Sequence, residues 1–158
     1  MTAAPETVDY PTEDGARVTA DLWPGGAHAL LIAHDAGTGR AALGEIAAEL
    51  AAHGLTVLVP DLGPVPAQAA PRVAGGVAYL RGRGAAAVSA LGIGDGAEAA
   101  GEAVLEALVA EIETLVLMAP TQLSGPVGLA TGRAIFLCAD EDLATITAMK
   151  QHQFAPDT

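Results

Sequence analysis

Residues 90–97 of the chain read Ala90-Leu91-Gly92-Ile93-Gly94-Asp95-Gly96-Ala97, and this stretch decides the fold. Gly92 and Gly96 flank Gly94 at the small-x-nucleophile-x-small spacing of a nucleophile elbow. Such an elbow turns sharply from a strand into a helix, so its flanking positions must leave room for a strained backbone. Gly94 stands where Ser, Cys or Asp would provide the attacking atom. The stretch therefore predicts the backbone of an elbow without its nucleophile.

The segments on both sides of the elbow have the order that such a turn requires. Ala85–Leu91 is an apolar run typical of a buried strand, and Ala97–Ala110 carries Val104, Leu105 and Leu108 at helical spacing. The sequence thus predicts a strand, a glycine turn and a helix in succession.

Short apolar runs alternate with helical patterns through the rest of the chain. The runs are typical of parallel strands buried on both faces: Ala29–Ala33, Thr56–Val59, Val88–Leu91, Leu115–Met118 and Ala134–Cys138. Ala41–His53 and Val73–Arg83 are predicted helices, the second beginning after Pro71. This alternation predicts an α/β fold, a doubly wound and mostly parallel sheet with helices on both faces and right-handed crossovers.

The N-terminal region follows a different pattern. Val8–Tyr10 and Ala16–Leu22 are predicted to form an antiparallel hairpin around Thr12-Glu13-Asp14-Gly15, because Asp-Gly favours positive φ. The proline-rich segment Gly63–Pro71 is interpreted as a loop. No linker is long enough to separate two folding units, so a single domain over residues 1–158 is predicted.

Composition excludes several classes of partner. Seven basic and nineteen acidic residues give a formal charge of −12, which repels nucleic acid and anionic membrane surfaces. The N-terminus has no signal-peptide pattern, and no apolar run approaches the length of about 18 residues that a membrane span needs. We therefore expect a cytoplasmic protein. Cys138, the single cysteine, has apolar neighbours that favour a buried strand thiol.

Further segments carry a family resemblance when they are taken in order. His28–Gly37 is similar to a strand and His-Gly turn that supply one oxyanion-hole amide, with Asp35 in place of the usual Gly. Ala51–Leu62 is similar to a helix end, a strand and a Pro-Asp loop, and Ala134–Asp142 to a strand and acid turn. Together with the elbow, they resemble the α/β-hydrolase superfamily, most closely small cap-less members such as dienelactone hydrolases and related esterases. The resemblance runs from about Val18 to Met149.

The resemblance implies a set of site residues. His34, Asp35, Ala36 and Gly37 correspond to the oxyanion loop, which His34 would order, and Asp142 corresponds to the acid of a catalytic triad. The family carries its histidine on a loop after one further strand. The sequence ends after a helical stretch at Leu143–Gln153, so the resemblance gives His152 no role as a base, and whether the chain is an enzyme stays open.

Other side chains near the elbow have competing interpretations. Asp95 is a candidate carboxylate nucleophile of the dehalogenase kind, but Ile93 would then occupy the position that must be small. The alternative is that Asp95 caps the following helix, and Asp142 is equally interpreted as part of a solvated turn or cap. Ser124 lies in a loop and Ser89 is expected to be buried in its strand, so neither replaces the nucleophile.

No cofactor or metal ion is expected. Gly92-x-Gly94-x-x-Ala97 fits a dinucleotide fingerprint, but the next strand ends at Met118–Thr121 without the acidic residue that would hold the ribose. Four histidines and one cysteine show no metal-ligand spacing.

Three hypotheses remain. The first is a catalytically silent hydrolase-like protein, which binds a small acyl or lactone-like ligand or another protein. The second is an ester or lactone hydrolase that uses an unconventional group such as Asp95, or a histidine supplied by a partner. The third is a shortened product of a longer hydrolase. A sheet with an exposed edge would favour a homodimer or a partner that completes it.

Overall fold

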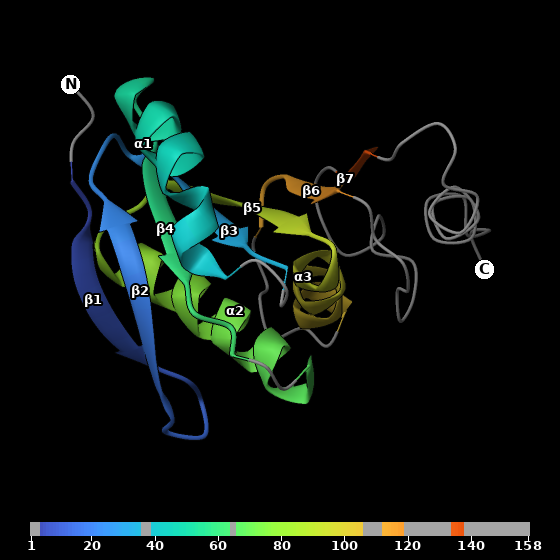
Figure 1. Ribbon diagram of the computed structural model, residues 1–158. Coiled ribbons are helices and arrows are strands. Elements are labelled where there is room, and N and C mark those ends of the chain that lie inside the picture. The colour runs from blue at the N-terminus through green and yellow to red at the C-terminus, as the bar shows by residue number, and fades with distance from the viewer. Residues whose placement is uncertain (1–3, 36–38, 64–65, 106–111, 119–133, 138–158) are drawn as a thin grey trace.

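The fold is a mixed sheet with helices on both faces (Figure 1). The computed structural model describes residues 4–35, 39–63, 66–105, 112–118 and 134–137. Within these residues the sheet has seven strands in the order β1-β2-β4-β3-β5-β6-β7. The strands are Glu6–Pro11 (β1), Arg17–Trp23 (β2), His28–Ala33 (β3), Thr56–Pro60 (β4), Ala87–Ile93 (β5), Leu115–Met118 (β6) and Ala134–Leu137 (β7). The predicted α/β class is confirmed.

The predicted N-terminal hairpin is present. β1 and β2 pair antiparallel from Glu6 opposite Leu22 to Pro11 opposite Arg17. In the turn, the Gly15 N–H donates to the Thr12 carbonyl at 3.0 Å, and Gly15 has a φ of 89°, as Asp-Gly predicts. β2 also runs antiparallel to β4 and so attaches the hairpin to the parallel strands β4, β3, β5, β6 and β7.

The helices divide between the two faces of the sheet. A short 3₁₀ turn (η1, Arg40–Leu43) leads into α1 (Gly44–Ala52), whose Ala47 and Ala48 contact Ile32 and Val57 on one face. On the other face, α2 (Pro66–Gly82) and α3 (Asp95–Leu105) cover Leu31, Leu58 and Leu117. Helices on both sides make the sheet doubly wound (Figure 1).

The packing of α2 relies on small residues. A Cβ added to Gly76 would lie 2.6 Å from Leu31 Cδ1 and 3.0 Å from the Tyr10 hydroxyl, so a larger residue there would require the buried Leu31 side chain to move. Tyr10 is fully buried beneath the helix, and its hydroxyl donates to the Arg72 carbonyl at 2.7 Å. This contact joins the hairpin to α2.

The start of α2 differs from the prediction. The sequence predicts a helix after Pro71, whereas α2 begins at Pro66 and contains Pro71. Pro71 lies in the second turn, so its missing N–H removes a single helical hydrogen bond. Ala69, Ala70 and Val73 are buried against the sheet, and their burial offsets that loss.

Among the described helices, none has the length and apolar content that a bilayer-spanning helix requires.

Candidate functional site

The turn between β5 and α3 has the geometry of an elbow. β5 ends at Ile93, Gly94 has a φ of 58° in the left-handed region, and α3 begins at Asp95. The Gly94 N–H donates to the Met118 carbonyl at 2.9 Å, and the Gly94 carbonyl accepts from the Ala97 N–H at 3.0 Å. The predicted succession of strand, glycine turn and helix is therefore present.

The two flanking glycines are sterically required. A Cβ on Gly92 would lie 2.5 Å from Ala97 Cα, and a Cβ on Gly96 would overlap the carbonyl oxygen of Ala33. α3 therefore begins directly against the carboxyl ends of β5 and β3. This close approach places residue 94 beside the end of β3.

The Asp35 carboxyl group occupies the space beside Gly94. A Cβ on residue 94 would lie 2.9 Å from Asp35 Cγ and 3.1 and 3.2 Å from its two oxygens. Asp35 follows β3 and is half-buried. A carboxyl group from one loop thus lies against the position where a nucleophilic side chain would begin at the apex of the elbow.

Asp95 lies next to this carboxyl group at the start of α3. It is the first residue of the helix, and the Gly94 carbonyl accepts the first helical hydrogen bonds, so a capping role for the Asp95 side chain stays a prediction. Partial removal from water raises the pKa of the Asp95 carboxyl group, and the charge and hydrogen bond of Asp35 and the charge of Glu98 raise it further. Protonated Asp95 can therefore donate a hydrogen bond to the Asp35 carboxyl group.

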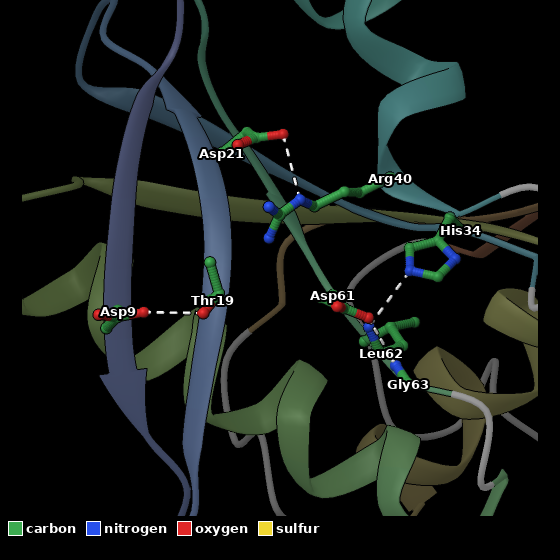
Figure 2. Close-up of polar contacts among 8 residues, drawn as sticks. All are labelled: Asp9, Thr19, Asp21, His34, Arg40, Asp61, Leu62 and Gly63. Atoms are coloured by element: carbon green, nitrogen blue, oxygen red, sulfur yellow. Dashed lines mark hydrogen bonds and ion pairs between the residues drawn. The ribbon is translucent and has the colours of Figure 1, made fainter.

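His34 joins two loops. Its Nδ1 lies 2.9 Å from the Asp35 carbonyl oxygen, and its Nε2 lies 3.2 Å from the Leu62 backbone nitrogen, which donates to it (Figure 2). This pattern requires the proton on Nδ1. The side chain is 4% exposed, and both ring nitrogens have backbone partners. His34 holds the loop that carries Asp35 against the loop after β4, and its predicted role in an oxyanion loop stays a prediction.

Figure 2 also shows how the loop after β4 is held. In this view the Gly63 N–H donates to Asp61 Oδ1 at 2.9 Å and closes a tight turn. In addition, Arg72, which the figure does not draw, donates to the Asp61 carbonyl at 3.0 Å. Leu62, the residue bonded to His34, is 3% exposed. The loop after β4 is therefore held by hydrogen bonds within itself, to His34 after β3 and to Arg72 of α2.

Other predicted residues lie elsewhere. Ser89 is half-buried, not buried as expected, and its hydroxyl lies 3.2 Å from Nε2 of the exposed His28 side chain on the neighbouring strand β3. Several predicted positions lie outside the described residues: Ala36, Gly37, Ser124, Cys138, Asp142 and His152. Within the described part of the chain, no group of three or more His, Cys, Asp or Glu side chains could hold a metal ion.

The position of the Asp35 carboxyl group was not predicted. The sequence contained a signal for it, because a side chain stands where the family pattern has Gly, and Gly stands where the pattern has a side chain. Asp35 alone predicts an altered loop, and Gly94 alone predicts an elbow without a side chain at its apex. Only their proximity shows that one side chain replaces the other.

The structure is similar to known hydrolases. The esterase Pf2001 of Pyrococcus furiosus matches with a TM-score of 0.66 and 21% identity over 74% of this chain and 52% of its own. The α/β hydrolase GrgF of Penicillium sp. sh18 matches with a TM-score of 0.64 and 19% identity, over 75% of this chain and 47% of its own. This chain thus spans about half the length of these two proteins.

The match to a third protein covers a larger share of both chains. ATU1826 of Agrobacterium tumefaciens, a protein of unknown function assigned to the α/β hydrolases, matches with a TM-score of 0.69 and 12% identity over 89% of this chain and 73% of its own. No family model and no curated protein matches the sequence.

Substituting Gly96 should test the steric constraint at the elbow. We expect Gly96→Ala to lower the free energy of unfolding by about 3 kcal/mol or more, because its Cβ meets the backbone of β3. The matched control is Gly82→Ala at the end of α2, where a Cβ meets nothing within 4 Å and should stabilise by up to about 1 kcal/mol. Urea unfolding measures both. Equal effects of the two substitutions would contradict the proposed constraint.

Substituting Asp95 should reveal its raised pKa. Because the folded state raises this pKa, the contribution of Asp95 to stability is present below the ordinary value of 3.8 and is lost as the pH rises through the raised value. Asp95→Asn cannot ionise, so we expect a slightly higher Tm than wild type at about pH 7 and the same Tm at about pH 3. Glu13→Gln, in the hairpin turn, controls for removing one negative charge. A Tm difference independent of pH would contradict the assignment.

Proposed function

We propose that this chain, whose fold is that of the α/β hydrolases, is catalytically silent at its elbow and acts by binding a small ligand there. One observation carries the proposal: the Asp35 carboxyl group occupies the space of the missing nucleophile beside Gly94. Glycine has no attacking atom, and a side chain at that position would require the Asp35 carboxyl group to move.

Electrostatics at the elbow supports a binding role. In acyl transfer, the N-terminus of a helix and nearby backbone N–H groups stabilise the negative charge that develops on the carbonyl oxygen. Here Asp35, Asp95 and Glu98 place carboxyl groups at the N-terminus of α3. Their negative charge opposes a developing oxyanion, whereas it favours a ligand with N–H or O–H donors.

The ligand proposal follows from this chemistry. A small acyl or lactone-like molecule carrying an O–H or N–H group could donate to Asp35 without a change in its own charge. The other role open to a catalytically silent protein is to bind a second protein.

A second candidate function is favoured by the pairing of Asp35 with Asp95. In its protonated form, Asp95 would present an acid beside the Asp35 carboxylate, which would act as a base. The Asp35 carboxylate would accept a proton from water as the water oxygen attacks an ester or lactone carbonyl. Protonated Asp95 would then donate its proton to the departing alkoxide oxygen. This pathway forms no covalent intermediate and needs no side chain at residue 94.

Hydrolysis of p-nitrophenyl acetate by purified protein distinguishes the two functions. We expect the wild-type rate to equal that of the buffer and of Asp35→Asn and Asp95→Asn, because no group attacks the ester. Glu13→Gln serves as the charge control. Wild-type turnover that falls about 100-fold or more in both Asp35→Asn and Asp95→Asn, but not in the control, would establish the acid–base pair and overturn the silent role.

A double-mutant cycle tests the observation on which the proposal rests. Gly94→Ser should destabilise the protein, by about 2 kcal/mol or more, through the positive φ and the contact with Asp35. In the Asp35→Gly background the same substitution should cost less, by about 1 kcal/mol, because the contact is gone. Urea unfolding of the four proteins gives this coupling energy. Additive effects would show that the Asp35 side chain does not occupy the space beside residue 94.

A further inference from the structure

A cluster of three polar side chains lies at the amino-terminal ends of the parallel strands, whereas the elbow lies at their carboxyl ends. His28 begins β3, Ser89 is near the start of β5, and Glu113 comes shortly before β6. The His28 Nε2 atom lies 3.2 Å from the Ser89 hydroxyl oxygen and 3.7 Å from Glu113 Oε2. Three residues far apart in the sequence therefore meet around one ring nitrogen.

Backbone pairing holds the three side chains in place. In the pairing of β3 with β5, His28 lies opposite Ala87. The Glu113 N–H donates to the Val88 carbonyl at 2.9 Å, and Ser89 belongs to β5 itself. All three residues are thus fixed relative to β5. A fixed backbone lowers the entropy that a bound ion would lose by ordering its ligands.

The imidazole and the carboxyl group are open to solvent. The side chain of His28 is 46% exposed and that of Glu113 is 59% exposed. An ion in solution can therefore reach both groups, and water molecules can complete its coordination. The net charge of −12 also attracts cations to the surface of the protein.

The distance between the two groups fits a zinc ion. Bonds from Zn²⁺ to a histidine nitrogen or a carboxylate oxygen are about 2.0–2.2 Å long, so the ligand atoms of a tetrahedral site lie about 3.3–3.5 Å apart. The 3.7 Å between His28 Nε2 and Glu113 Oε2 is slightly longer, and a small rotation of the exposed Glu113 side chain would close the difference. A neutral imidazole with its proton on Nδ1 leaves the Nε2 lone pair available to the ion.

We propose that His28 and Glu113 bind a Zn²⁺ ion through Nε2 and Oε2, with water at the remaining coordination positions. The Ser89 hydroxyl lies close enough to hydrogen-bond to one of these water molecules. The described part of the chain contains no metal-binding group of three or more His, Cys, Asp or Glu side chains, so this site relies on two of them and on water. It is therefore an exchangeable site, unlike a structural zinc site with four protein ligands.

Calorimetric titration of the full chain with ZnCl₂ tests the site. We expect a single Zn²⁺ ion to bind with a Kd of about 0.1 mM at neutral pH. His28→Gln should weaken this binding at least about tenfold, because it removes the imidazole nitrogen. His53→Gln is the matched control, since His53 is also exposed but lies at the end of α1. The absence of binding, or equal affinity in the two variants, would overturn the proposal.

The contribution of Glu113 is tested in the same way. Glu113→Gln should weaken Zn²⁺ binding about tenfold, whereas Glu13→Gln removes an equal charge in the hairpin turn and should leave the affinity unchanged. Equal losses in these two variants would show that Zn²⁺ is attracted only by the overall negative charge, and would overturn the proposal.

Nitrogen NMR of the imidazole rings locates the ion. Zn²⁺ should shift the Nε2 resonance of His28, whereas Mg²⁺, which prefers oxygen ligands, should leave it unchanged. A Zn²⁺-dependent shift confined to other histidines, or the same shift with Mg²⁺, would overturn the proposal.

Discussion

The close approach of Gly96 to the backbone of Ala33 is the constraint on which the elbow depends. β3 and β5 are neighbouring parallel strands that pair from His28 opposite Ala87 to Ala33 opposite Gly92. Their carboxyl ends therefore meet at one edge of the sheet, where a Cβ at residue 96 would overlap the Ala33 carbonyl oxygen. Glycine allows α3 to start there, and its first turn fixes the position of residue 94. The loop after β3 is held beside it, because His34 bonds to the Asp35 carbonyl and to Leu62.

Asp35 and Gly94 are best understood as one exchange of a side chain between two loops. Each residue departs from the family pattern by itself. Asp35 is a side chain in place of glycine, and Gly94 is a glycine in place of the nucleophile. In space, the Asp35 carboxyl group lies against the position where a side chain at residue 94 would begin. The exchange keeps the strained elbow backbone and brings two carboxyl groups into contact where a hydrolase develops negative charge. The proposed loss of turnover follows from this change in charge as well as from the missing nucleophile.

Several features could be predicted from the sequence because they depend on local patterns. Apolar runs located the strands, and Asp14-Gly15 located the hairpin turn. The spacing of Gly92 and Gly96 located the elbow. Predictions that depended on neighbours distant in the sequence were wrong. α2 includes Pro71 because burial of Val73 and its neighbours offsets a lost hydrogen bond, and Ser89 is half-buried beside the exposed side chain of His28.

The sequence by itself determined the α/β architecture, the hairpin and the position of the glycine elbow, since periodicity and glycine conformation act over a few residues. Only the tertiary structure decided where the Asp35 carboxyl group lies, that His34 bonds to backbone through both nitrogens, and that the Trp23 N–H faces no protein acceptor among the described residues. These features join segments far apart in the chain. Hydrogen bonds and steric contacts extend over only a few ångströms, so they exist only once the sheet has brought those segments together.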